Sequence, residues 1–503
     1  MWARENSRPP PRDVAVIDVG SNSVRLVLYR IEGRAIWTVF NEKVLAGLGK
    51  GVAATGRLSL EGRRQALAAL KRFRAVVDGA NPDEVYTAAT AAIREASDGR
   101  DFLQDVRRET GLVIRVLSGE EEARYAALGV CAGASKLEGV VGDLGGSSLE
   151  LSRVTADATL RGVTLPLGPF SLGAPKPLDL EVKGRAMRHL SPIADQFRTE
   201  TFVAVGGAWR NLALVHMAAN AYPLRIVHQY EFPASEALAT AQLIARQSKS
   251  SLERIPGLSK KRVETLPYAA VVLEAVIDSL SVKTVAISAY GVREGLLFEA
   301  MTPQTQALNP LVEGCAALGA RLGIAEPLSP ALYAWLLPLW SQFVPVFSAE
   351  RDRVLLEAAS HLCDIGARLH PDHRADLAFD QVLRAPIAGQ NHAERSFLAV
   401  ATYYRYANIN SALDSPDVVK LLSPERFRRA RALGAAMRLG CDLSGRTPEL
   451  LARTQLELAD TRLRILLQAG FADMIQGDQT RKRVSALAEA LERQFEIVEE
   501  KRP

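Results

Sequence analysis

The sequence contains few cysteines and no long apolar run, and each of these absences excludes a class of protein. Only four cysteines occur in 503 residues, and none forms a pair at the spacing of a zinc site. We therefore expect reduced thiols in a cytoplasmic protein. No segment approaches the roughly 18 apolar residues of a membrane span. Residues 1–12 are polar and lack the apolar core of a signal peptide, so we expect a flexible tail there.

The charge balance is nearly even. The chain has 62 Lys and Arg against 57 Asp and Glu, a net charge of +5. No long basic block with interleaved aromatics is present, so we expect neither DNA nor a membrane as partner. The small excess is compatible with a polyanionic substrate. One cluster, Arg426 to Arg431, is interpreted either as the solvated face of a helix or as a contact for such a polyanion.

One short motif occurs twice. It reads Asp18-Val-Gly-Ser-Asn-Ser-Val-Arg-Leu26 and then Asp143-Leu-Gly-Gly-Ser-Ser-Leu-Glu-Leu151. Apolar residues precede each copy and apolar/polar alternation follows it, which indicates a strand, a tight turn and a second strand. Backbone N–H groups in such turns bind phosphate. Two facing turns would form a phosphate-binding cleft with a carboxylate on each side.

Residues 13–310 alternate between strand and helix patterns, which favours an α/β fold. The repeat divides this region into two similar halves, 13–135 and 136–310. The predicted helices include Leu60–Val77 and Glu120–Val130. The predicted strands are Val14–Val19, Ser23–Ile31, Glu84–Thr87, Val113–Leu117, Val140–Asp143, Ser148–Val154, Thr201–Val205 and Thr284–Ala289.

Helical periodicity replaces the strand patterns after Pro310. We therefore expect an all-helical portion that divides into 311–445 and 446–503, with linkers or turns at Pro310, Pro327–Pro330 and Leu443–Thr447. Four segments carry the periodicity: Val354–Leu369, Glu394–Tyr406, Pro448–Leu467 and Arg483–Val498.

The first turn supplies candidate ligands for phosphate and metal. Backbone and side-chain donors of Gly20, Ser21, Asn22 and Ser23 suit phosphate, and Asp18 suits a hydrated Mg²⁺. An ordinary hairpin turn, stabilised by Asp and Asn side chains, is the alternative. The duplication favours the phosphate interpretation.

The second turn supplies a similar set. Gly145, Gly146, Ser147 and Ser148 are the candidate phosphate-binding residues, and Asp143 is the candidate metal ligand. Glu150 follows Asp143 by seven residues and could share its metal environment. A cross-strand salt bridge is the alternative role for Glu150.

A run of three glutamates opens the predicted helix before the second turn. Ser118 and Glu121 have the spacing of a capping box, and Glu120 suits the helix dipole. Glu122 is left without a local structural role. A glutamate whose proton affinity is raised by neighbouring carboxylates is a candidate general base for activating water.

Three further strand-to-helix junctions can contact phosphate. Arg94 projects from the first and suits bidentate contact with phosphate, or a surface salt bridge. Gly206 and Gly207 open the second, where helix N–H groups can bind an anion. The segment from Ser288 to Gly295 forms the third. Gly47-Leu-Gly-Lys50-Gly lacks the spacing of a P-loop and is interpreted as a loop with Lys50 near the cleft.

Five of these motifs occur together in the order of a known family. They are Asp18 to Leu26, Ala89 to Arg94, Glu121 to Arg124, Asp143 to Glu150 and Gly291 to Gly295. The chain closely resembles exopolyphosphatases and guanosine pentaphosphate phosphohydrolases. The resemblance implies two ribonuclease H-like domains of the actin, sugar kinase and Hsp70 superfamily. It also implies an HD-like helical domain over 311–445 and a C-terminal domain over 446–503.

The resemblance assigns roles to individual residues. Glu122 matches the catalytic base, Asp18, Asp143 and Glu150 match the metal and phosphate carboxylates, and Arg94 matches a phosphate-contacting arginine. Ser147 replaces a glycine of the family pattern, where a positive φ would be strained. Ala208 replaces a Thr or Ser. Cys363 replaces the histidine of a His-Asp pair, which implies an HD-like domain without metal.

The resemblance also implies an activity. We expect Mg²⁺-dependent, processive removal of terminal phosphate from inorganic polyphosphate by a cytoplasmic homodimer. Hydrolysis of guanosine pentaphosphate (pppGpp), alone or in addition, is the main alternative. The same fold would also suit an ATP-dependent kinase or a non-catalytic polyphosphate or nucleotide sensor.

Overall fold

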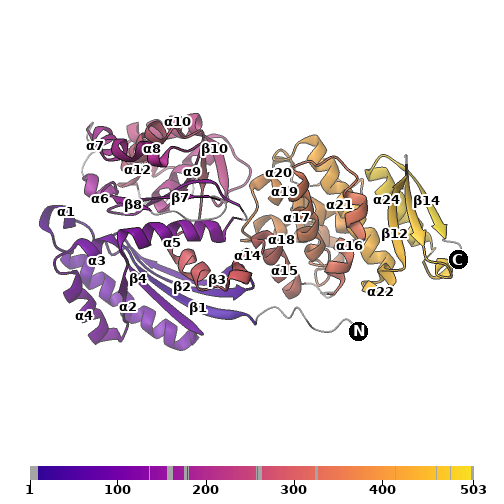
Figure 1. The fold of residues 1–503 in the computed structure, drawn as a ribbon, viewed down its shortest axis with the longest axis horizontal. Helices are drawn as coiled ribbons and strands as arrows, with labels where there is room; N and C mark the ends of the chain where they lie inside the picture. Colours follow the sequence, from indigo (N-terminus) through magenta and orange to yellow (C-terminus); the bar gives the residue numbers. More distant parts are fainter. Residues whose placement is uncertain are drawn as a thin grey trace. The chain divides into compact units, whose positions relative to one another are not determined.

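A five-stranded sheet forms the first half of the chain's larger unit, Met1–Ala307 (Figure 1). Its strand order is β3-β2-β1-β4-β5. Strands β1 to β3 are antiparallel neighbours, whereas β4 and β5 run parallel to β1. The strands are β1 (Arg12–Val19), β2 (Val24–Glu32), β3 (Ala35–Val44), β4 (Glu84–Ala89) and β5 (Arg115–Val116).

A second sheet repeats this topology. Its order is β10-β11-β9-β6-β7-β8. Strands β6 to β8 are antiparallel neighbours, and β9 and β11 run parallel to β6, as in the first sheet. Strand β10 is an addition at the edge. The strands are β6 (Gly139–Leu144), β7 (Leu149–Val154), β8 (Val163–Leu165), β9 (Thr201–Val205), β10 (Tyr230–Pro233) and β11 (Thr284–Ile287). The predicted duplication is therefore confirmed.

Alternating side chains of β1 serve two hydrophobic cores, because successive residues of a strand face opposite sides of the sheet. Ala15 and Ile17 lie in the core that contains Phe73 of α2 (Leu60–Ala80) and Phe102 of α4 (Gly99–Thr110). Val14 and Val16 lie in the core that contains α5 (Gly119–Ala132) and α13 (Val292–Glu299). In the second half, α9 (Gly207–Ala219) and α12 (Leu266–Leu280) fill the corresponding core.

Further helices lie in the described part of this unit. They are α1 (Val52–Thr55), α3 (Ala91–Glu95), α6 (Pro169–Leu172), α7 (Val182–Leu190), α8 (Ala194–Phe197), α10 (Ala234–Arg246), α11 (Lys249–Leu252) and α14 (Pro303–Ala307), with a 3₁₀ turn at Ser191–Ile193.

The second unit, Leu308–Pro503, is mostly helical. Its helices are α15 (Pro310–Leu322), α16 (Leu328–Trp340), α17 (Ala349–Leu362), α18 (Arg374–Arg384), α19 (His392–Tyr406), α20 (Pro416–Val419), α21 (Pro424–Ser444), α22 (Pro448–Leu451), α23 (Ala472–Ile475) and α24 (Asp478–Ala490), with a 3₁₀ turn at Pro371–His373. Of the segments expected as linkers or turns, Pro310 begins α15 and Pro327–Pro330 includes the start of α16, whereas α21 ends at Ser444 within Leu443–Thr447.

The C-terminal part is not all helical, which corrects the sequence-based prediction for 446–503. The segment predicted as the helix Pro448–Leu467 contains α22 and the hairpin of β12 (Thr454–Ala459) and β13 (Arg462–Leu467). Strand β14 (Gln494–Glu499) pairs with β13 and ends the predicted helix Arg483–Val498 early. Buried Leu463, Ile465 and Leu467 alternate with the less buried Arg462, Arg464 and Leu466, and this two-residue period is that of a strand.

These descriptions come from a computed structural model that describes residues 10–134, 136–155, 162–174, 178, 181–255, 258, 263–322, 327–413, 415–459, 461–475 and 477–499. Most of the predicted tail therefore lies outside the described residues. Arg12 already belongs to β1. Within the described parts of the chain, no helix has both the length and the apolar character required to cross a membrane.

Candidate active site

The two repeated motifs form equivalent hairpin turns. In the first, the Gly20 N–H donates to the Ser23 carbonyl at 2.9 Å, and in the second the Gly145 N–H donates to the Ser148 carbonyl at 2.9 Å. The register places Asp18 opposite Arg25 and Asp143 opposite Glu150. Directly opposed residues share one face of a sheet. Each aspartate therefore lies beside the residue seven positions further along.

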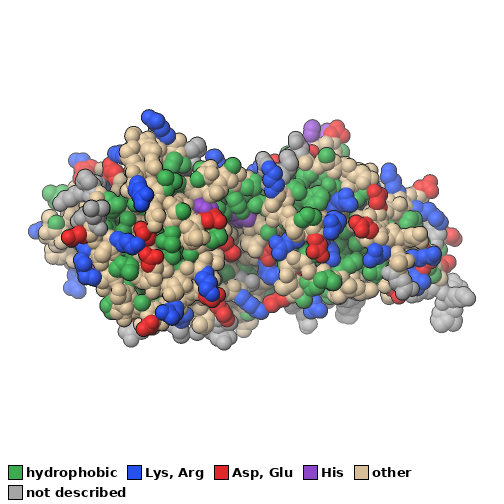
Figure 2. Space-filling model, turned by 90° about the horizontal axis from the view of Figure 1, so that it is seen from above, with side chains coloured by type: hydrophobic (Ala, Val, Ile, Leu, Met, Phe, Trp, Pro, Cys, Tyr) green, Lys and Arg blue, Asp and Glu red, His purple; other side chains and the backbone are tan. Residues whose placement is uncertain are grey.

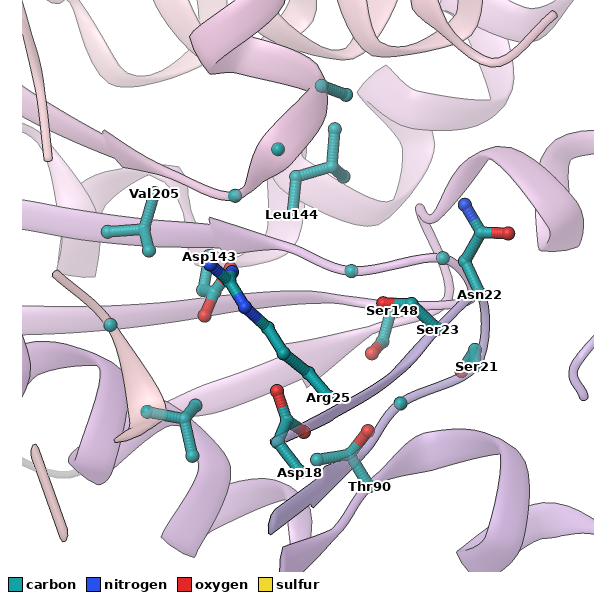
Figure 3. Close-up of a pocket in the computed structure, with 18 of the residues that line it drawn as sticks. Asp18, Ser21, Asn22, Ser23, Arg25, Thr90, Asp143, Leu144, Ser148 and Val205 are labelled. Carbon is teal, nitrogen blue, oxygen red and sulfur yellow. The ribbon is translucent and has the colours of Figure 1, made fainter. Parts of the chain in front are cut away.

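Both turns line one cavity of about 150 Å³ (Figure 3). Side chains from both halves face this space, including Asp18 and Thr90 from the first half and Asp143 and Ser148 from the second. The structure therefore brings together most of the residues predicted from the motifs. Those that line the cavity are Asp18, Gly20, Ser21, Asn22, Ser23, Glu122, Asp143, Gly145, Gly146, Ser148, Gly206 and Gly207.

The close approach of the two turns depends on glycine. A Cβ atom added to Gly146 would lie 3.1 Å from the Cβ of Ser21 in the first turn. Gly206 has a φ of 108°, and an added Cβ would lie 2.5 Å from the Leu144 carbonyl oxygen. A side chain at either position would push on the walls of the cavity.

Ser147 occupies its turn without the strain expected from the family pattern. Its φ is not positive, its side chain is buried, and its carbonyl accepts from the Ser171 hydroxyl at 2.6 Å. It does not line the cavity, unlike Ala208. Its proposed phosphate contact stays a prediction.

Glu122 lies in the first turn of α5, and the capping box predicted around it is present. Glu121 and Ser118 exchange hydrogen bonds, as the spacing indicated. Glu122 is only 7% exposed. Burial raises the pKa of Glu122 to about 7 against the opposing effect of Arg94, and the Asp143 and Asp18 carboxylates add to the rise. Glu122 therefore exchanges protons near neutral pH.

Arg94 contacts Glu122 rather than lining the cavity. Its Nη1 donates to Glu122 Oε2 at 3.0 Å and to the Leu117 carbonyl at 2.9 Å. The guanidinium thus joins the end of the loop before α5 to the carboxylate of the first helical turn. This contact fixes the Glu122 side chain and favours its charged form. A direct contact between Arg94 and phosphate stays a prediction.

Two more carboxylates interact with Glu122, the buried Glu150 and the partly buried Asp143. Neither oxygen of Glu150 meets a hydrogen-bond donor at bonding geometry, although the residue is only 1% exposed. Burial raises its pKa well above the ordinary value, and the Glu122 carboxylate adds to the rise. Burial likewise raises the pKa of Asp143 to about 6, against the effect of Arg210. Such carboxylates are stabilised by a cation.

The donor set suits Mg²⁺ only if water and substrate complete it. Within the residues that the structure describes, no three His, Cys, Asp or Glu side chains gather closely enough to hold a metal ion by themselves. Mg²⁺ is commonly bound by one or two carboxylates together with water and substrate phosphates. The unpartnered oxygens of Glu150, opposite Asp143, fit this arrangement.

Four basic residues of the cavity were not predicted from the motifs: Lys43, Arg25, Arg210 and Arg293. Arg293 Nη1 donates to Asp18 Oδ2 at 3.1 Å, and Arg210 Nη1 donates to the Ala289 carbonyl at 3.0 Å. Burial, together with the charges of the neighbouring Arg293 and Arg210, lowers the pKa of Arg25 to about 10. Mutually repelling arginines in one cavity favour an anionic ligand.

Two further predictions concerned basic residues, Lys50 and the cluster from Arg426 to Arg431, and none of these residues lines the cavity. In the second unit, Arg426 donates to the Val346 carbonyl and lies over Phe347, and Arg429 lies over Phe343. These two members of the arginine cluster therefore hold a loop.

Basic and acidic side chains are interspersed among the coloured residues of the face in Figure 2.

The Cys363-Asp364 pair of the predicted HD-like domain contacts cationic side chains. Arg446 Nε donates to Asp364 Oδ1 at 2.8 Å. Arg405 Nε donates to the Cys363 carbonyl at 2.9 Å. A guanidinium thus neutralises the carboxylate that would otherwise be available to a metal.

The fold and site define a class of protein. The two halves of the first unit share one strand topology and present two glycine turns, carboxylates and arginines around one cavity. A family model described as the Ppx/GppA phosphatase family matches residues 27–304, more than half of the chain. A second, described as "Exopolyphosphatase, C-terminal", matches residues 339–498. The chain belongs to the Ppx/GppA phosphatase family.

Two solved structures share this fold with TM-scores above 0.5. An exopolyphosphatase from Cytophaga hutchinsonii is 21% identical with a TM-score of 0.53, over 57% of this chain and 97% of its own. An exopolyphosphatase-like protein is also 21% identical with a TM-score of 0.51, over 57% and 97% of the two chains. The Aquifex aeolicus Ppx/GppA family member is 26% identical over 58% of this chain and all of its own, with a TM-score of 0.49.

Proposed function

We propose that the protein is an exopolyphosphatase, which hydrolyses the terminal phosphate of inorganic polyphosphate. The observation that carries the proposal is the position of Glu122, a buried carboxylate with a pKa of about 7 in the wall of a cavity formed by two phosphate-type turns. The match of residues 339–498 to an exopolyphosphatase C-terminal model supports this substrate.

The terminal phosphoryl group would lie between the two hairpin turns. N–H groups inside the turns and the hydroxyl groups of Ser21 and Ser148 are the proposed donors to its oxygens. Arg25, Arg210 and Lys43 offset the charge of the next phosphates along the chain. Phosphoryl transfer of this kind depends mainly on positioning and charge stabilisation.

Glu122 is the proposed general base. As a carboxylate it accepts a proton from a water molecule while the water oxygen bonds to the terminal phosphorus. The bond from that phosphorus to the bridging oxygen breaks, and the shortened polyphosphate leaves. A base with a pKa near the working pH is the most efficient. Arg94 keeps the carboxylate in place and charged between turnovers.

Asp143 and Glu150 are the residues that would hold Mg²⁺, with Asp18 close by and paired to Arg293. When bound, the ion supplies Lewis-acid neutralisation of phosphate charge. The protein's own contribution is the buried Glu150 carboxylate, whose charged form a bound cation would stabilise.

The proposal is tested by phosphate release from polyphosphate and from pppGpp by the same preparation. We expect polyphosphate to be the better substrate, measured as kcat/KM. Negligible release from polyphosphate together with release from pppGpp would assign the alternative activity. The homodimer implied by the sequence resemblance also stays a prediction, to be checked by sedimentation.

A further inference from the structure

The second unit contains a basic cavity that the catalytic proposal does not use. It has a volume of about 220 Å³ and lies at the C-terminal end of α19, the loop after it, α21 and α24. Three cationic side chains line it, Arg438 from α21 and Lys482 and Arg483 from α24. All of its residues belong to Leu308–Pro503, whereas the catalytic cavity lies in Met1–Ala307.

The charges around this cavity are incompletely balanced. Arg483 Nε donates to Asp442 Oδ2 at 2.6 Å, and Arg438 donates to the Ala407 carbonyl, a neutral group. Burial, together with the Arg483 and Arg405 charges and against the effect of Asp442, lowers the pKa of Arg438 to about 10. Glu489 is the one carboxylate among the described lining residues. A bound anion would relieve this repulsion.

The neutral part of the lining is held in a fixed geometry. In the loop after α19, the Asn410 N–H donates to Asn408 Oδ1 at 3.0 Å, and the Ser411 N–H donates to the Asn408 carbonyl at 3.0 Å. Both asparagines line the cavity. Amide groups presented by an ordered turn supply donors to an oxyanion at little entropic cost.

The aromatic lining residue does not offer a face for a nucleobase. The Tyr404 ring makes edge contacts with Tyr403 and Phe427, its hydroxyl donates to the Ser411 carbonyl at 3.1 Å, and the residue is 4% exposed. The lining therefore favours a compact charged group over a stacked base.

We propose that this cavity binds one compact phosphate-class oxyanion, either free orthophosphate or the phosphate of a monoester. Arg438 and Lys482 supply positive charge, and the Arg483 guanidinium bonds to both the anion and Asp442. The inference is independent of the catalytic proposal, because it uses no residue of the active site.

Equilibrium dialysis of radiolabelled orthophosphate against the full-length protein tests the proposal. The double variant R438Q/K482Q removes two cavity charges. The control R481Q/R493Q removes two exposed charges outside the cavity, from α24 and the residues just after it. We expect R438Q/K482Q to bind one phosphate fewer per chain than the wild type and the control, with unchanged polyphosphate hydrolysis in dilute phosphate. Because Arg438 bonds to the loop, the exposed single variant K482Q is measured too, and we expect about tenfold weaker binding at this site.

An equal phosphate stoichiometry in R438Q/K482Q, K482Q and the control would overturn the proposal. So would binding of long-chain polyphosphate at the cavity with no binding of orthophosphate. Competition by glycerol 3-phosphate, a small monoester without a base, identifies the source: displacement of orthophosphate from the cavity assigns a monoester, and a lack of displacement assigns the free anion. Both of these results support a compact oxyanion site.

Discussion

The two halves of the first unit share a hairpin but differ in the residue beside its aspartate. Asp18 lies opposite Arg25 in the first half, and Asp143 lies opposite Glu150 in the second. Strand order, turn hydrogen bonds and the seven-residue spacing are the same in both. A cation occupies one position and a carboxylate the equivalent one.

This difference teaches how a duplicated fold can make an asymmetric site. Arg25 adds to a group with Arg210 and Arg293 that suits phosphate oxygens. Glu150 adds to a group with Glu122 and Asp143 that suits a cation and proton transfer. We therefore assign charge recognition to the first hairpin and metal binding to the second. The predictions below test that assignment.

The largest effect on polyphosphate hydrolysis is expected from a substitution of Glu122, which lies outside both hairpins. Glu122→Gln removes the proposed base while keeping the side-chain size. We expect polyphosphate hydrolysis to fall by about 10³-fold, within the range for loss of a general base, and polyphosphate binding to persist. Phosphate release is the measurement, and Glu120→Gln, an exposed neighbour in the same helical turn, is the control. A wild-type rate in Glu122→Gln would show that Glu122 is not the base.

Glu150→Gln tests the second hairpin. Loss of the carboxylate that lacks a protein partner is expected to lower kcat by about 10- to 100-fold at a fixed Mg²⁺ concentration, as for other metal-site residues. Thermal stability without Mg²⁺ should stay the same or increase, because the variant has no carboxyl group whose charged form burial would disfavour. An unchanged kcat would remove Glu150 from the metal site.

Arg25→Gln tests the first hairpin. We expect about a tenfold increase in KM for polyphosphate with a smaller change in kcat, since the arginine contributes charge to binding. Arg30→Gln is the matched control, because Arg30 lies on the same strand but pairs with Asp13, near the end of the hairpin away from the turn. A fall in kcat with constant KM would contradict the assignment of Arg25 to recognition.

Arg94→Gln changes the pH dependence more than the maximal rate. Activity requires the Glu122 carboxylate, so kcat/KM should rise with pH through about 7 in the wild type. Arg94 stabilises that carboxylate, and its removal raises the Glu122 pKa. We expect the rising limb of the profile to move up by about one pH unit. A rising limb that stays in place would show that Arg94 does not act through Glu122.

The smallest effect is expected at Ser147. Its φ is not positive, so restoring the glycine of the family pattern relieves no strain. Ser147→Gly should change kcat and KM by less than about twofold, because only a buried hydroxyl is lost. A large gain in activity would indicate that the serine hinders the second hairpin turn.

Much of the first unit was predictable, because its turns and cores depend on local pattern. The two hairpins and the capping box at Ser118 follow from short motifs, and the structure shows them. Strand β3 was missed because its outer residues are polar and exposed. Strands β8 and β10 were missed because they are only three and four residues long. The C-terminal hairpin was mistaken for a helix because leucines at short intervals match either period.

Most of the arginines of the site could not be assigned to it from sequence motifs. Arg210 and Arg293 come from separate helices, and only the tertiary fold brings them to Asp18 and Asp143. Arg25 could have been predicted from the sequence, because it follows Asp18 by the same seven residues that separate Glu150 from Asp143. The contact of Arg94 with Glu122 joins two junctions 28 positions apart and required the parallel pairing of β4 and β5.

A titration of Mg²⁺ against polyphosphate hydrolysis in Glu150→Gln and Arg25→Gln tests the assignment of separate roles most directly. We predict that Glu150→Gln needs about tenfold or more Mg²⁺ for half-maximal rate. We predict that Arg25→Gln keeps the wild-type Mg²⁺ midpoint at saturating polyphosphate. The same shift in both variants, or a shift in Arg25→Gln alone, would contradict the account.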